Sequence, residues 1–136
     1  DGYNMIFAWE ELSDMADLSL ESARNLLVET LCSYQSYWGK RTIVVFDAYR
    51  QPGNIGMTEN ILGVEVVYTK EGQTADQYIE KFVLEHVKKM RITVATSDGL
   101  EQMMIFGQGA LRMSARELRQ KVLDTEREIR EKHLGK

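Results

Sequence analysis

The sequence predicts an α/β domain in which helices flank a mainly parallel sheet. Apolar, β-branched runs alternate along the chain with segments whose apolar residues recur at helical spacing. This alternation is typical of right-handed crossovers between parallel strands. With 136 residues, 43% of them hydrophobic and 28% charged, the chain has the length and composition of one globular domain, and we expect it to span 1–136.

One helix and two strands are predicted in the first half of the chain. Apolar residues from Leu20 to Trp38 fall on one helical stripe, and Ser19 is placed to cap its start. The continuous apolar run 42–46 is typical of a strand buried on both faces. A second strand is predicted at 64–68.

In the second half, a helix is predicted to begin at Thr74, which forms a capping box with Gln77. A third strand follows at 92–96, then a short helix at 99–106 and a short last strand at 111–113.

A second capping box, made by Ser114 and Glu117, predicts the start of the last helix, with Leu118, Val122 and Ile129 facing inward.

The first residues, Asp1 to Asn4, have the composition of a turn that follows a strand. A parallel sheet of this kind needs a central strand, and no strand residues precede Asp1 in the sequence. We therefore expect the first strand to be truncated.

Charge and composition exclude several classes of protein. A net charge of −4 argues against non-specific DNA binding, and no apolar run approaches the roughly 20 residues of a membrane span. Cys32 is the one cysteine, which excludes an internal disulfide and favours a reducing, cytoplasmic location. Together with His86 and His133 it cannot supply the four ligands of a structural zinc site.

Aspartates follow the predicted strands at the points where ligands bind in open α/β sheets. Asp47 comes directly after one strand, and Asp98 comes shortly after another. Asp76 lies in the first turn of the helix that follows the strand 64–68, and Asp1 stands where the missing strand would end. We expect the four carboxylates to meet at one edge of the sheet.

Carboxylates packed together repel one another unless a cation neutralises them, and Mg²⁺ or Mn²⁺ prefers such oxygen ligands. A metal held there orients and activates water and neutralises charge on a phosphate, which predicts phosphoester hydrolysis. A structural interpretation also stands for single residues. Asp76 gains stability at a helix N-terminus, and Asp98 with Glu101 fits an N-terminal capping box.

Six short motifs are spread in order over essentially the whole chain. Four of them lie at 1–6 (DGYNMI), 44–48 (VVFDA), 74–76 (TAD) and 95–98 (ATSD), and two more at 105–112 (IFGQGALR) and 114–118 (SAREL). The first four resemble the NYN domains of the PIN-like nuclease superfamily, and the other two narrow the resemblance to the bacterial YacP-like family.

The resemblance implies a PIN-like, Rossmann-like three-layer fold and metal-dependent endonucleolytic cleavage of single-stranded RNA with Mg²⁺ or Mn²⁺. It places Asp1, Asp76 and Asp98 in the catalytic metal centre. Asp47 joins them as a metal-binding or orienting group, and Asn4 and Glu101 support them.

Five residues in or near the segments that border this edge are candidates for RNA contact, through phosphates or by stacking on bases. For the charged ones, an ordinary solvated surface position is the alternative. Trp9 and Tyr49 are further candidates for stacking, and Trp9 is equally well explained by packing. The five candidates are Tyr3, Arg50, Lys70, Lys81 and Arg112.

The resemblance also implies the ribosome as the partner that delivers RNA, with messenger RNA in the A site as the target, and neither DNA nor a membrane as a partner. The basic stretch from Arg112 to Arg130 is a candidate docking surface, although interleaved glutamates could pair with its arginines instead. The alternative function is a catalytically weak RNA- or ribosome-binding module on the same fold.

Overall fold

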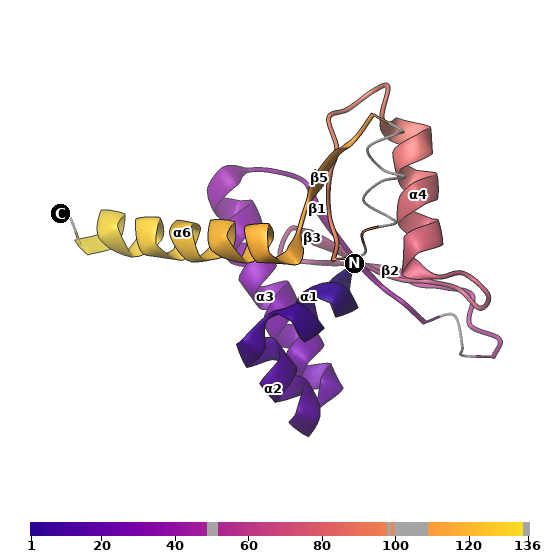
Figure 1. The fold of residues 1–136 in the computed structure, drawn as a ribbon, viewed down its shortest axis with the longest axis horizontal. Coiled ribbons are helices and arrows are strands. Elements are labelled where there is room, and N and C mark those ends of the chain that lie inside the picture. The colour runs from indigo at the N-terminus through magenta and orange to yellow at the C-terminus, as the bar shows by residue number, and fades with distance from the viewer. Residues whose placement is uncertain (49–51, 98, 100–108, 135–136) are drawn as a thin grey trace.

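The structure is a computed structural model, and it describes residues 1–48, 52–97, 99 and 109–134. In the described part of the chain, three helices are followed by three strands, and a further helix separates these strands from two short strands and the last helix (Figure 1). In chain order they are α1 (Gly2–Ala8), α2 (Glu10–Leu18), α3 (Leu20–Trp38), β1 (Thr42–Phe46), β2 (Met57–Ile61), β3 (Val64–Tyr68), α4 (Ala75–His86), β4 (Thr93–Ala95), β5 (Leu111–Met113) and α6 (Ala115–Leu134).

The first sheet has the order β1-β3-β2. β1 and β3 pair in parallel, as the sequence predicts for the two buried runs, so this prediction is confirmed. β2 pairs antiparallel with β3 through a two-residue turn in which Leu62 and Gly63 both have positive φ, 48° and 91°. The sequence analysis missed β2 because every one of its residues is exposed, which leaves no alternation of apolar and polar positions.

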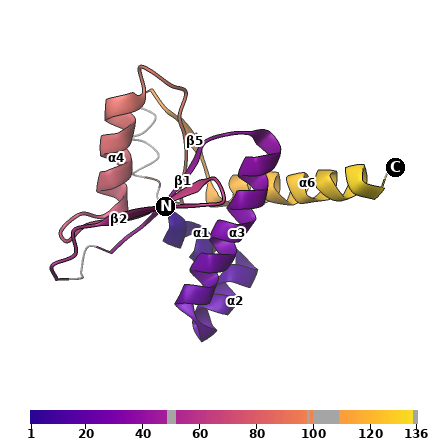
Figure 2. The ribbon, with the colours of Figure 1, turned by 180° about the vertical axis from the view of Figure 1, so that it is seen from behind.

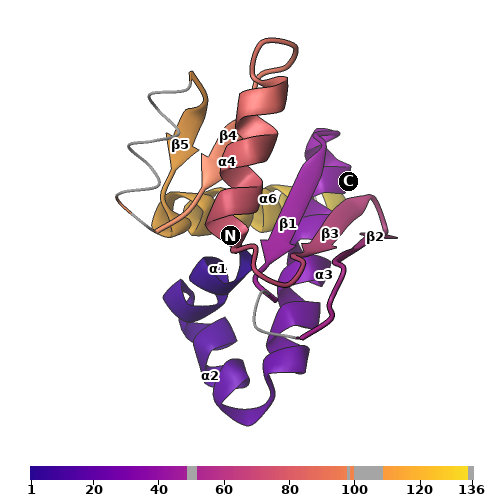
Figure 3. The same ribbon diagram turned by 90° about the vertical axis from the view of Figure 1, so that its right-hand side faces the viewer.

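A second sheet consists of β4 and β5, which pair in parallel. The predicted strands 92–96 and 111–113 are confirmed, but the prediction of one mainly parallel sheet is wrong for the described part of the chain. There, β4 is not hydrogen-bonded to β1 or β3, and the N-terminus of the chain lies between the two sheets (Figure 3). The fold is an α/β domain with two small sheets, one of them mixed.

Helix α4 covers one face of both sheets. Ile79 and Val83 of α4 pack with Val45 and Val67 of the first sheet and with Val94 of β4. The predicted capping box at its start is confirmed, since the Thr74 hydroxyl accepts from the backbone of Gln77 and the Gln77 side chain accepts from the backbone of Thr74. This helix therefore joins the two sheets into one layered body.

Helices α1, α2 and α3 cover the opposite face of the first sheet. Phe46 of β1 and Val66 of β3, which alternate with the residues under α4, pack with Leu27 of α3 and Ile6 of α1. Both faces of β1 are buried, as the sequence predicts. The helix 20–38 and its Ser19 cap are also confirmed.

The predicted turn at the start of the chain is wrong. Asp1 instead caps a helix, α1, and α2 follows it after the single residue Trp9. These two helices have 7 and 9 residues, too few for a helical stripe to stand out in the sequence. The expected strand ahead of Asp1 stays a prediction.

The last helix, α6, begins at the predicted capping box of Ser114 and Glu117. Val122 is buried, and the Trp38 indole nitrogen of α3 donates to the Thr125 hydroxyl at 2.9 Å. The rest of α6 projects away from the sheets, as Figures 1 and 2 show from opposite sides. Among the described helices, none combines the length and apolarity of a membrane span. The helix predicted at 99–106 falls almost wholly outside the described residues.

Candidate active site

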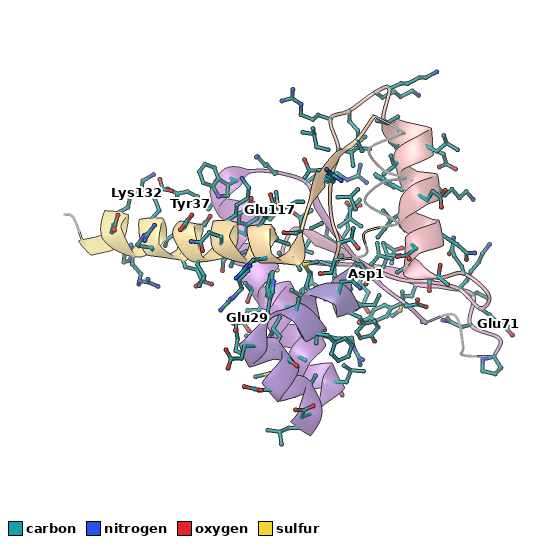
Figure 4. The ribbon with its side chains drawn as sticks, in the orientation of Figure 1. Asp1, Glu29, Tyr37, Glu71, Glu117 and Lys132 are labelled. Carbon is teal, nitrogen blue, oxygen red and sulfur yellow. The ribbon has the colours of Figure 1, made fainter. Side chains whose placement is uncertain are left out.

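Asp1 begins α1 at the point where β1 and β4 end. Its carboxylate accepts a hydrogen bond from the backbone of Asn4 at 3.3 Å, which caps the helix, and its backbone nitrogen donates to the Ala95 carbonyl at 3.2 Å. Gly2 lies against the buried Phe46 ring, so closely that a Cβ at this position would overlap the ring. These contacts hold Asp1 beside the ends of both strands (Figure 4).

Asn4 binds the segment that follows β4. Its side-chain oxygen accepts from the Thr96 hydroxyl at 2.9 Å and from the Ser97 backbone at 2.8 Å. Thr96 is fully buried, so its hydrogen bond with Asn4 forms away from water. Asn4 therefore fixes the two residues that lead to Asp98, which itself lies outside the described residues.

Asp47 connects the end of β1 with the start of α4. One of its carboxylate oxygens accepts from the backbone nitrogen of Ala75 at 3.4 Å, in the first turn of that helix. Asp76 is the next residue, and both aspartates are partly exposed. The helix N-terminus stabilises negative charge at this position, where two carboxylates come from different elements.

Thr69, directly after β3, holds the backbone that follows β1. Its hydroxyl accepts from Ala48 at 2.9 Å, its own nitrogen donates to Phe46 at 3.0 Å, and its carbonyl accepts from the Asn54 amide at 2.9 Å. The sequence analysis did not find Thr69 or Thr96. The signal in the sequence was a threonine directly after each of the strands β3 and β4. Both threonines are fully buried.

The structure thus brings Asp1, Asn4, Asp47 and Asp76 to elements that meet at one edge. Among the described residues, no three Asp, Glu, His or Cys side chains are grouped closely enough to hold a metal. The predicted centre includes Asp98 and is therefore not tested. The chemistry of the predicted ligands, all carboxylate oxygens, fits Mg²⁺ or Mn²⁺. Glu101, like Asp98, lies outside the described residues.

The described RNA-contact candidates differ in the exposure of their side chains. Lys70, Lys81 and Arg112 are exposed. Tyr3 is partly buried, its hydroxyl accepts from Arg24 at 3.2 Å, and its ring packs on Phe46 with centroids 5.1 Å apart. Two candidates, Arg50 and Tyr49, lie outside the described residues.

Trp9 is 2% exposed and its indole nitrogen donates to the Ala115 carbonyl at 2.9 Å, so its packing role is confirmed and stacking on a base is excluded.

A groove of about 550 Å³ opens beside Ser97, between the starts of α2 and α6. Arg119 in this groove pairs with Glu11 at 2.5 Å, whereas Arg116 is exposed and forms no ion pair with any described residue. Sequence reasoning did not single out Arg116, because only the tertiary structure brings the first turn of α6 next to the residues before Asp98.

Cysteine chemistry does not contribute to this site. Cys32 is buried on α3, and its thiol donates to the Ile61 carbonyl at 3.1 Å. Burial, and secondarily the negative charge of Glu29, raises the pKa of the Cys32 thiol, which disfavours the thiolate that a nucleophile needs.

Two small sheets between layers of helices, with aspartates after β1 and at the starts of α1 and α4, define an α/β domain of the PIN-like, NYN class. The family model of the YacP-like NYN domain matches residues 1–136, and the chain belongs to this family. Membership implies nuclease activity and a nucleic-acid substrate.

Particular relatives come from Bacillus subtilis. The YacP protein of strain 168 is 50% identical over 131 residues, which cover 95% of this chain and 76% of YacP. The crystal structure of Rae1 (YacP) is 48% identical and superposes with a TM-score of 0.83, over 99% of this chain and 78% of Rae1. A mutant of the same protein is 49% identical with a TM-score of 0.80, over 96% and 76%.

Proposed function

We propose that this protein is a divalent-metal-dependent endoribonuclease that cleaves single-stranded messenger RNA in the ribosomal A site. The proposal rests on family membership together with one observation in the structure. Asp47 binds the start of the helix that carries Asp76, and Asn4 binds the segment that leads to Asp98. One contact links the end of β1 to the start of α4 and the other links α1 to the segment after β4, which supports the carboxylates acting together on one phosphate.

In the proposed site, Asp1, Asp76 and Asp98 hold the metal, with Asp47 beside them. A bound Mg²⁺ or Mn²⁺ would supply activation of water and neutralisation of phosphate charge. Asn4 acts as a positioning residue, since its oxygen binds the Thr96 hydroxyl and the Ser97 backbone nitrogen rather than an expected reacting atom.

The proposed chemistry is in-line displacement at phosphorus. The oxygen of water forms the new P–O bond, the bond to the 3′ oxygen breaks, and this oxygen leaves with a proton. The products carry 5′-phosphate and 3′-hydroxyl ends. This chemistry does not use the ribose 2′-hydroxyl, so no cyclic phosphate forms.

Chelation of divalent metal with EDTA is expected to abolish cleavage, and added Mg²⁺ or Mn²⁺ to restore it, because the carboxylates alone have no means of neutralising a phosphate. The measurement is cleavage of an end-labelled RNA, with the product ends mapped by sensitivity to phosphatase and kinase. Cleavage that continues in EDTA, or 2′,3′-cyclic phosphate ends, would refute this mechanism.

Asn4→Ala is expected to lower kcat by about 10- to 100-fold, as losing a supporting hydrogen-bond partner does at metal sites. The Thr96 hydroxyl and the Ser97 nitrogen lose the Asn4 oxygen as an acceptor, so the segment before Asp98 is held less firmly. Asn25→Ala, an exposed position on α3, is the matched control and should leave kcat unchanged. If Asn4→Ala alters only the unfolding free energy and not kcat, the positioning role is wrong.

The net charge favours delivery of the RNA by a carrier, and the family resemblance implies the ribosome as that carrier. A chain with net charge −4 has weak general attraction for RNA, so a carrier that raises the local RNA concentration increases the rate. We expect faster cleavage of one messenger on translating ribosomes than of the same messenger free in solution, with Asp98→Asn as the inactive control. A protein that acts on translating ribosomes is expected in the cytoplasm.

Equal rates on the two substrates would remove the ribosome from the proposal. If neither the ribosome-bound nor the free messenger is cleaved when divalent metal is present, the alternative is favoured, a binding module on the same fold.

A further inference from the structure

A basic loop connects α4 to β4, at the end of the second sheet opposite Asp1 (Figure 1). The basic loop comprises Lys88, Lys89, Met90 and Arg91, and all four side chains are exposed. Arg91 and Ser97 are six positions apart, which in extended chain is roughly 20 Å. The basic loop is therefore well separated from the edge where the aspartates gather.

The basic loop lines a groove of about 470 Å³. Besides the loop, the described residues that line the groove are apolar or small, and none of them is acidic. Within the described part of the chain, none of the three cations forms an ion pair with an acidic side chain. The remaining lining residues are Val87, Ile92, Gly109 and Leu111.

Backbone hydrogen bonds fix the loop. The nitrogens of Lys89 and Met90 both donate to the His86 carbonyl, at 2.9 and 3.1 Å, and Leu111 donates to the Ile92 carbonyl at 2.9 Å. The three cations are thus presented from a defined turn. Binding an anion there requires ordering of side chains only, which lowers the entropic cost.

A structural explanation accounts for part of this pattern. Cations near a helix C-terminus interact favourably with the helix dipole, and Lys88 and Lys89 directly follow the end of α4. The effect falls off beyond the last turn, and Arg91 lies outside it. In a chain of net charge −4, three unpaired cations within four residues repel one another unless a polyanion neutralises them.

We propose that this groove binds the phosphate backbone of double-helical RNA. Single-stranded RNA is bound largely by aromatic rings that stack on bases, and none of the described residues that line the groove is aromatic. Duplex RNA, in contrast, is recognised through its phosphates and shape. This inference goes beyond the proposed cleavage, because binding here requires none of the aspartates. It rests on the proposed function only in assuming that the polymer is RNA.

The test is the salt dependence of binding to a fluorescent RNA duplex of about 20 base pairs, followed by anisotropy in EDTA. The binding constant is measured between about 50 and 200 mM KCl for the wild type and for the triple variant Lys88→Gln, Lys89→Gln, Arg91→Gln. Each lost phosphate contact should reduce the slope of log K against log salt by about 0.9, so the triple variant should lose roughly 2 to 3 in slope.

The matched control is Lys40→Gln, Arg41→Gln, Lys132→Gln, which removes the same charge from exposed positions outside both the basic loop and the candidate docking stretch from Arg112 to Arg130. It should keep the wild-type slope. Equal losses in both variants, or none in the loop variant, would overturn the inference. Thermal unfolding of both variants checks that the fold is retained.

Three further outcomes separate this inference from the alternative partners and from the proposed function. If the loop variant loses as much affinity for a single-stranded oligouridine as for the duplex, the assignment to double-helical RNA is wrong. If the wild type binds no duplex, an acidic protein becomes the better partner. If the duplex binds through the basic loop but metal-supplemented protein cuts no RNA, the proposed function fails and this inference stands.

Discussion

Asp76→Asn is expected to slow RNA cleavage about a thousand-fold, equivalent to about 4 kcal/mol of transition-state stabilisation. Asparagine keeps the shape of the side chain but loses the charge that would hold a divalent cation. Asp76 lies in the first turn of α4, next to the nitrogen that Asp47 binds, so the substitution removes one of the two carboxylates at this point. The measurement is single-turnover cleavage of one RNA with saturating Mg²⁺.

The stability of Asp76→Asn should change little, by about 0.3–1 kcal/mol, because only the interaction with the helix N-terminus is weakened. Asp17→Asn on α2, an exposed aspartate, is the matched control and should keep full activity. Activity of Asp76→Asn within a few-fold of the control would show that Asp76 belongs to the helix cap and not to a metal centre.

Trp9→Ala is expected to reduce the free energy of unfolding by about 3–5 kcal/mol, the range for removing a large aromatic residue from a core. Trp9 joins α1 to α2 and is 2% exposed. Its indole nitrogen donates to Ala115 at the start of α6, and the guanidinium of Arg119 lies 5.5 Å from its ring centroid. The substitution leaves a cavity and removes the hydrogen bond to the Ala115 carbonyl where three helices meet.

Urea denaturation followed by circular dichroism measures this loss. Trp38→Ala provides the comparison, since Trp38 also donates to α6, through Thr125, but is 46% exposed. We expect about 1–2 kcal/mol for Trp38→Ala, mostly from its hydrogen bond and the half of the ring that is buried. A smaller loss for Trp9 than for Trp38 would contradict the packing role of Trp9.

Helix starts could be predicted from the sequence because capping is local. The capping boxes of Thr74 with Gln77 and of Ser114 with Glu117 each involve residues three apart, and the structure confirms both. The buried strand β1 was predictable for a related reason, since a run of apolar residues needs cover on both faces. The exposed strand β2 carries no such signal and exists through its pairing with β3.

The candidate site was predictable only in part. The rule that ligands bind beyond the ends of strands singled out Asp47 and Asp76, and the structure brings Asp47 to the first turn of α4. It could not show that Asn4 would bind Thr96 and Ser97, because these residues are more than 90 positions apart in the chain. Hydrogen bonds of this range depend on the packing of whole elements.

The sequence by itself determined which segments become buried strands and capped helices, and it determined membership of the family, because both are written in local patterns and motifs. The tertiary structure decided that the strands form two sheets, that Asp1 begins a helix between them, and that Trp9 is packed rather than free to stack on a base. Burial and long-range hydrogen bonds are properties of the assembled chain, and residue spacing alone does not specify them.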